Sequence, residues 1–204
     1  MFNKMNLPNK LTIIRIILVP IFIIFMSLNT EWTWPLYVAL GIFVVAAITD
    51  FLDGMISRKN NLVTKFGKIM DPLADKLLIS AGFVMLTGVG VVPAWITAII
   101  IFRDFFVNSL RMFGADKGSD LAAALSGKIK TTFQLVGVVL AILDRAIVTK
   151  YGFGSFISNS LNMSMFGLLI NVFMTVCISV AVIATIVSMV QYIFVFKKDI
   201  NIEE

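Results

Sequence analysis

Long apolar stretches separated by short polar segments run through the whole chain. A helix needs about 20 mostly apolar residues to cross a bilayer. The last stretch is longer than one crossing requires, so we expect it to tilt or to protrude. We predict an all-α membrane protein in which one domain, residues 1–204, holds six transmembrane helices: 11–28, 34–57, 70–88, 93–113, 127–146 and 165–196.

The segments between these helices carry turn and loop signals. Gly88, Gly90 and Pro93 predict a tight turn between the third and fourth helices. Residues 151–163 are uncharged but rich in serine, asparagine and glycine, which favours a loop or surface segment over a further crossing.

Composition narrows the class of protein. Apolar residues make up 59% of the chain and charged residues only 14%, whereas about a quarter of a soluble domain is charged. This balance excludes a soluble enzyme, a disordered chain and a nucleic-acid-binding module. Histidine is absent and Cys177 is the one cysteine, so imidazole chemistry, an intrachain disulfide and a thiolate metal cluster are excluded too. We expect Cys177 to pack in the core.

Lysine and arginine are divided unequally between the two sides of the predicted bundle. With six crossings both chain ends face one side, which would hold 15 of the 17 basic residues, and only Arg145 and Lys150 fall on the other. The positive-inside rule then places both termini in the cytoplasm, and we expect the membrane to be that of a bacterial cell. On the opposite side we interpret Asp144 and Arg145 as a solvated surface pair.

The second predicted helix carries carboxylates at the depth of the lipid. Residues 34–49 are 16 uncharged residues, about 24 Å of helix at 1.5 Å per residue. The hydrocarbon layer is about 30 Å thick. The helix must therefore continue through Asp50 and Asp53 before it reaches water.

The third predicted helix repeats this feature. Residues 77–89 alone are too short to cross, so the helix should begin near residue 70 and include Asp71 and Asp75. Ionisable residues at such depth cost several kcal/mol and normally mark function.

The spacing of these aspartates places each pair on one helix face. Asp50 and Asp53 are three residues apart, and Asp71 and Asp75 are four apart. The connecting loop is short, so we expect the two helices to be antiparallel neighbours. Four carboxylates can then point into one gap.

We expect cations to bind in this gap, because four carboxylates close together repel one another unless positive charge lies among them. Mg²⁺ prefers oxygen ligands, and two such ions, or two Mn²⁺ ions, serve phosphoryl transfer by stabilising the attacking and leaving oxygens. Gly54 and Gly67 remove side-chain bulk beside the gap, so a phosphate or nucleotide could approach the backbone. The structural alternative is that Arg58, Lys68 or Lys76 neutralises each carboxylate at a helix end.

The sequence around these aspartates resembles the signature of the CDP-alcohol phosphotransferase family. That signature reads D-x-x-D-G-x-x-A-R, about eight residues, and G-x-x-x-D-x-x-x-D. Residues 50–58 (DFLDGMISR) and 67–75 (GKIMDPLAD) match seven of its eight fixed positions. Ser57 replaces the alanine, a small-for-small change whose hydroxyl could add a hydrogen bond near the cytidine.

The resemblance implies a fold and a set of residue roles. Six transmembrane helices would surround a polar cavity open to the cytoplasm, in a homodimer. Asp50, Asp53 and Asp71 would ligate metal, and Asp75 would lie at the metals and act as general base for the acceptor hydroxyl. That hydroxyl would attack the β-phosphorus of a CDP-linked donor, and CMP would leave. The donor would be bound by Asp50, Gly54, Ser57, Arg58 and Gly67.

The first predicted helix offers a further polar face. Asn9, Thr12 and Arg15 recur at three-residue intervals, which places them on one side of the helix. We expect this side to line the cavity, with Asn9 and Thr12 at the donor. The alternative is that Arg15 anchors the helix in the membrane interface.

Three segments, 5–15, 71–78 and 127–134, are similar to those family members that join CDP-diacylglycerol to glycerol 3-phosphate. The pair Arg103-Asp104 occupies a position where these family members have Arg-Glu. This difference affects the identification of the acceptor substrate more than the identification of the family. Basic residues suited to an anionic acceptor are present. We expect an arginine and lysine cluster to bind its phosphate through charge-assisted hydrogen bonds: Arg103, Arg111, Lys128 and Lys130.

Each part of this hypothesis has an alternative. Arg103 could pair with a carboxylate such as Asp104 or Asp75, and the lysines could be ordinary positive-inside anchors. The acceptor could be inositol phosphate, serine or phosphatidylglycerol. A divalent-cation transporter could use the same aspartates as a transit site, although transport needs no nucleotide pocket and the acids cluster toward one side.

Overall fold

A computed structural model of the chain describes residues 7–28, 33–60, 65–116, 125–148, 153–154 and 164–200. These residues form helices and no strands, as the sequence predicts, and each helix matches one predicted stretch to within a few residues. The helices are α1 (Leu7–Ser27), α2 (Trp34–Asn60), α3 (Lys65–Gly88), α4 (Ala94–Asp116), α5 (Leu125–Val148) and α7 (Met165–Ile200).

The helix ends bear on the position of the aspartates. Helix α2 continues past Asp50 and Asp53 to Asn60, and α3 already begins at Lys65, so Asp71 and Asp75 both lie within it. The prediction that all four belong to helices is therefore confirmed. Helix α2 is long because its apolar span Trp34–Leu52 continues into a polar segment that remains helical to Asn60.

The predicted turn between α3 and α4 is also confirmed. Gly90 has a φ of 76°, in the left-handed region that a residue without a Cβ adopts easily. The N–H of Val91 donates to the carbonyl of Leu86 at 2.9 Å, which caps the end of α3.

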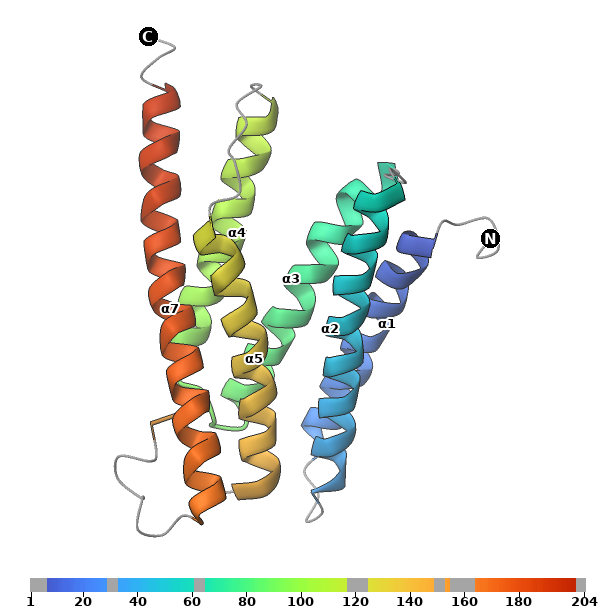
Figure 1. The fold of residues 1–204 in the computed structure, drawn as a ribbon, viewed down its shortest axis with the longest axis vertical. Coiled ribbons are helices and arrows are strands. Elements are labelled where there is room, and N and C mark those ends of the chain that lie inside the picture. The colour runs from blue at the N-terminus through green and yellow to red at the C-terminus, as the bar shows by residue number, and fades with distance from the viewer. Residues whose placement is uncertain are drawn as a thin grey trace.

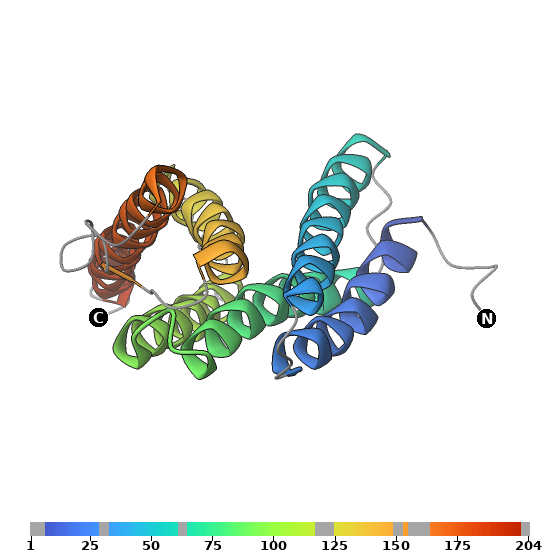
Figure 2. The same ribbon diagram turned by 90° about the horizontal axis from the view of Figure 1, so that it is seen from below.

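The six described helices lie side by side, and the chain reverses direction from each helix to the next (Figure 1). Seen along the bundle, α1, α2 and α3 form one group and α4, α5 and α7 the other, with α3 next to α4 (Figure 2). Helices α2 and α3 are antiparallel and in contact, as predicted. The upper end of Figure 1 collects the last turns of α2, α4 and α7 and the first turns of α3 and α5. We call it the polar end, because the halves of α1, α2, α3, α4 and α5 nearest to it hold every predicted site residue except Arg103, which lies near the middle of α4.

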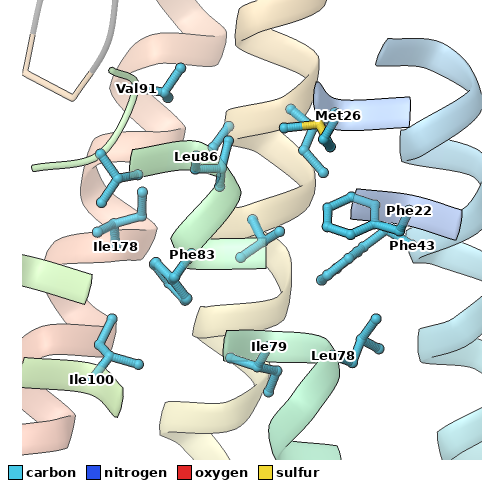
Figure 3. Close-up of a cluster of buried hydrophobic side chains, with 14 of the residues drawn as sticks. Phe22, Met26, Phe43, Leu78, Ile79, Phe83, Leu86, Val91, Ile100 and Ile178 are labelled. Carbon is cyan, nitrogen blue, oxygen red and sulfur yellow. The ribbon is translucent and has the colours of Figure 1, made fainter. Parts of the chain in front are cut away.

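The apolar core lies toward the opposite end of the bundle (Figure 3). Phe22 of α1 and Phe43 of α2 pack with ring centroids 5.4 Å apart. Gly82 of α3 allows close packing here, because a Cβ at that position would lie 2.9 Å from Val138 of α5. Cys177 is buried, in agreement with its expected place in the core.

Among the residues that the structure describes, three helices are by length and composition able to cross a membrane: Lys10–Ser27, Trp34–Leu52 and Met165–Phe194. The apolar run Lys76–Gly88 of α3 is shorter. Large apolar side chains are exposed along the outside of the helices, which is typical of surfaces that face lipid. Examples are Ile24, Phe51, Trp95, Phe102, Phe166 and Phe194. These features indicate a membrane protein.

Candidate active site

The structure describes only part of the predicted site at side-chain level. Asp50, Thr12, Arg103 and Lys130 are described. The remaining predicted side chains lie outside the described set, and the roles assigned to them remain predictions: Asn9, Asp53, Gly54, Ser57, Arg58, Gly67, Asp71, Asp75, Arg111 and Lys128.

Asp50 is held by an arginine of the first helix. The Nη1 atom of Arg15 lies 2.7 Å from the Oδ1 atom of Asp50. The Arg15 side chain is fully buried, whereas the Asp50 side chain is 38% exposed. Thr12, one turn before Arg15, is fully buried as well. A buried arginine is not an interfacial anchor, so this alternative for Arg15 is wrong. The ion pair fixes one oxygen of the first motif aspartate by a charge-assisted contact.

A second group of charges is buried between α4, α5 and α7. Asp104 of α4 accepts from Arg103 at 3.2 Å and also contacts the Nζ of Lys130 on α5. The guanidinium of Arg103 in turn donates to Ser188 of α7. It also lies 6.0 Å from the ring centroid of Tyr192, within the range of a cation–π contact. We call Arg103, Asp104, Lys130 and Ser188 the cation cluster.

Burial makes the cation cluster unusual. Its four side chains are at most a few per cent exposed. Removing charges from water costs several kcal/mol per ion unless they are paired and hydrogen-bonded. The two predicted acceptor residues that are described, Arg103 and Lys130, are thus brought together from different helices. Arg103 also has the carboxylate partner that the sequence left open, Asp104.

Sequence reasoning missed the contribution of α7. Ser188 and Tyr192 lie in the long apolar stretch 165–196, which reads as an ordinary crossing. A signal was present, because Thr185, Ser188 and Tyr192 recur at intervals of three and four residues and so share one helix face. All three are buried, which marks this as the inward face of α7.

The matched family model covers nearly the whole chain. The description of that model is CDP-alcohol phosphatidyltransferase, and the match extends over residues 5–196. The chain belongs to this family. Both aspartate pairs and the cation cluster lie within the matched range, which ends after Tyr192.

Relatives from three bacterial genera share the name CDP-diacylglycerol–glycerol-3-phosphate 3-phosphatidyltransferase. The Bacillus subtilis protein is 44% identical over 148 residues, covering 68% of this chain and 77% of the relative. The Rickettsia felis protein is 42% identical over 138 residues, covering 68% and 75%. The Escherichia coli K12 protein is 36% identical over 153 residues, covering 72% and 82%.

The family is known to use divalent metals, and the donor set of this member fits them chemically. The motif supplies four carboxylates at helical spacing on α2 and α3, and hard divalent ions prefer such oxygen ligands. Asp50, whose carboxylate is partly exposed, is the one whose side chain is described. No group of three or more potential ligands lies together among the described side chains, a set that excludes Asp53, Asp71 and Asp75.

The far end of α5 holds a different buried polar pair. The amide Nδ2 of Asn171 on α7 lies 3.3 Å from each carboxylate oxygen of Asp144 on α5, and both side chains are fully buried. The prediction of a solvated Asp144–Arg145 pair is therefore wrong for Asp144. The sequence shows two adjacent charges near a helix end, but the close packing of α5 on α7 turns Asp144 inward.

Proposed function

We propose that this protein transfers the phosphatidyl group from CDP-diacylglycerol to glycerol 3-phosphate. The products would be phosphatidylglycerophosphate and CMP, a step of phospholipid biosynthesis. The observation that carries this proposal is that buried Arg103 and Lys130, joined through Asp104, lie in the same bundle as the aspartate motif. Relatives that bear the name of this reaction support the choice of acceptor.

The proposed membrane arrangement follows from charge and helix direction. We propose six transmembrane helices around a polar cavity that opens to the cytoplasm, with both termini cytoplasmic, in the cell membrane of a bacterium. The positive-inside rule supports this sidedness, because 15 of 17 basic residues belong to the proposed cytoplasmic side. By family resemblance the protein would be a homodimer.

The donor would bind along α1, α2 and α3. Asn9, Thr12, Asp50, Gly54, Ser57, Arg58 and Gly67 would contact it. Asp50, Asp53, Asp71 and Asp75 would hold two Mg²⁺ or Mn²⁺ ions, which when bound neutralise the diphosphate and stabilise CMP as it leaves. Arg15 would keep the Asp50 carboxylate in place through the 2.7 Å ion pair.

The chemical step needs one positioned base. Asp75 would accept the proton of the primary hydroxyl of glycerol 3-phosphate. The hydroxyl oxygen would then attack the β-phosphorus of CDP-diacylglycerol. The bond between this phosphorus and the bridging oxygen would break, and that oxygen would leave with CMP. The protein contributes chiefly by holding the two substrates in line.

The acceptor phosphate would bind to Arg103, Arg111, Lys128 and Lys130. Two of these, Arg103 and Lys130, share Asp104 as a partner. Asp104 would hold their long side chains in place, so less conformational entropy is lost when a phosphomonoester binds. The guanidinium of Arg103 presents a planar fork of donors that suits phosphate oxygens.

Two other functions remain as alternatives. Within the family, the acceptor could be inositol phosphate, serine or phosphatidylglycerol. Of these, serine and phosphatidylglycerol carry no phosphomonoester, so they would not use a buried cation cluster fully. A divalent-cation transporter would need neither the cation cluster nor a nucleotide pocket.

The deciding experiment measures CMP release. Purified protein in detergent or liposomes is incubated with CDP-diacylglycerol and Mg²⁺, and each candidate acceptor is added separately. We expect CMP release with glycerol 3-phosphate to exceed that with inositol phosphate, serine or phosphatidylglycerol. Preference for another acceptor would reassign the substrate within the family. No release with any acceptor, together with Mg²⁺ flux into sealed liposomes, would favour the transporter.

A further inference from the structure

One buried side chain near the cation cluster has no hydrogen-bond partner among the described residues. Gln134 of α5 is fully buried. Neither its amide nitrogen nor its amide oxygen has a hydrogen-bond partner in the part of the chain that the structure describes. Burying such a group unpaired is costly, and unpaired buried polar groups are rare in folded proteins. The described neighbours of Gln134 therefore do not explain why its amide is buried.

The position of Gln134 links it to the cation cluster. It follows Lys130 by four residues on α5, so the two side chains share a helix face and lie about 6 Å apart along the axis. Lys130 contacts Asp104, the shared partner of the cluster. One turn further along the same face is Val138, which belongs to the apolar core. Gln134 thus lies at the boundary between the cation cluster and the core.

We propose that Gln134 is a specificity-determining residue that binds the hydroxyl of the acceptor that does not react. This inference rests on the proposed function. With the phosphate at Arg103 and Lys130, a three-carbon phosphate ester could extend its C2 hydroxyl toward an amide one turn away. An amide both donates and accepts hydrogen bonds, which matches a hydroxyl group on both counts. The unpaired amide would then be satisfied only when the acceptor is bound.

The test uses an acceptor that lacks only this hydroxyl. 3-Hydroxypropyl phosphate keeps the phosphate and the attacking primary alcohol but has no C2 hydroxyl. We expect wild-type protein to prefer glycerol 3-phosphate over this analogue by about 10- to 100-fold in kcat/KM, the size of effect that a buried hydrogen-bonding group produces when left unpaired. In Gln134→Leu the preference should fall to near unity, through loss of activity on glycerol 3-phosphate alone.

A matched control and a structural measurement separate the outcomes. Gln191 is the other glutamine of the chain and is exposed on α7, so Gln191→Leu should keep the wild-type preference. Gln134→Leu should also unfold at an equal or higher temperature than wild type, because it removes an unpaired buried amide. Gln134→Met, which is closer in shape, replaces Gln134→Leu if the latter does not fold.

Three results would overturn the inference about Gln134. These are an unchanged preference in a folded Gln134 variant, an equal loss of activity on both acceptors, or a failure of both variants to fold, which would make the amide structural. Failure of the proposed function looks different. In that case wild-type protein itself would release no CMP with glycerol 3-phosphate.

Discussion

The two ends of α5 hold buried polar groups of opposite character. Near its start, Lys130 and Arg103 share the single carboxylate of Asp104, and Gln134 lies one turn away with an unpaired amide. Near its end, Asp144 receives the amide of Asn171 at both oxygens. Donors predominate in the first region, whereas in the second a carboxylate is satisfied by a neighbouring helix.

This difference separates a ligand site from a structural contact. A polar group whose hydrogen bonds are made within the protein holds two helices together and needs no ligand. In membranes such side-chain hydrogen bonds contribute about 0.6–2 kcal/mol to stability. A buried region that gathers cationic donors from two helices and leaves an amide unpaired among the described residues is suited to an anionic, hydroxylated ligand. We therefore expect changes at the two ends of α5 to have different consequences for activity and stability.

The largest expected effect is metal removal. Excess EDTA should abolish CMP release, and added Mg²⁺ should restore it, because the four motif carboxylates are proposed to act through divalent ions. Mg²⁺ should also raise the unfolding temperature of wild type and of Asp144→Asn, but less that of Asp50→Asn. Turnover that persists in excess EDTA would contradict the proposed metal site.

The second effect concerns two aspartates that differ in role. Asp75→Asn should lower kcat by about 10²- to 10⁴-fold, the usual contribution of a general base, while CDP-diacylglycerol still binds. Asp144→Asn, the same chemical change at the far end of α5, should leave kcat close to wild type. If both variants lost kcat equally, the contrast between the two regions would be lost.

A smaller effect is expected for the acceptor phosphate. Arg111→Ala should raise the KM for glycerol 3-phosphate by about 10- to 100-fold, because a charged hydrogen bond to phosphate is lost. The KM for CDP-diacylglycerol should change much less. Arg145→Ala, the same change beside Asp144, serves as the control and should alter neither KM. Equal effects of Arg111→Ala on both substrates would move Arg111 out of the acceptor site.

The smallest effect should appear at the structural contact. Asn171→Leu leaves the Asp144 carboxylate without the amide of its partner, and we expect a loss of about 1–3 kcal/mol in the free energy of unfolding. The double variant Asp144→Leu/Asn171→Leu removes both polar groups and should recover much of this loss. Thermal unfolding measures the stability, and kcat should stay near wild type in the folded double variant. A strong loss of kcat there would assign Asp144 a role in catalysis.

Much of the fold could be predicted from the chain itself. Long, mostly apolar stretches predict all six described helices, because hydrophobic burial and helix formation depend on residues that are close in sequence. The thickness of the hydrocarbon layer also predicts that α2 continues past Asp50 and Asp53, because its uncharged residues alone are too few to span that layer. The turn at Gly90 is local too, since its left-handed backbone needs only a residue without a Cβ.

Contacts between helices were predicted less well. The motif identifies Asp50, but its partner Arg15 lies on another helix. From the sequence alone, Arg15 could either line the cavity or anchor the helix in the membrane interface. Ser188 was overlooked, because one hydroxyl in a long apolar helix carries no charge and barely changes its hydropathy. Asp144 was assigned to the surface, because adjacent charges near a helix end do not reveal which of them faces a neighbour.

The sequence by itself determined the helices, the membrane character and the aspartate motif, all of which depend on the local order of residues. Only the tertiary structure decided that Asp104 joins Arg103 to Lys130, that Arg15 holds Asp50, and that the buried amide of Gln134 has no hydrogen-bond partner in the described part of the chain. The physical reason is that these properties depend on how helices rotate and approach one another. That geometry comes from packing over the whole bundle, where a glycine such as Gly82 can set the distance between two helices.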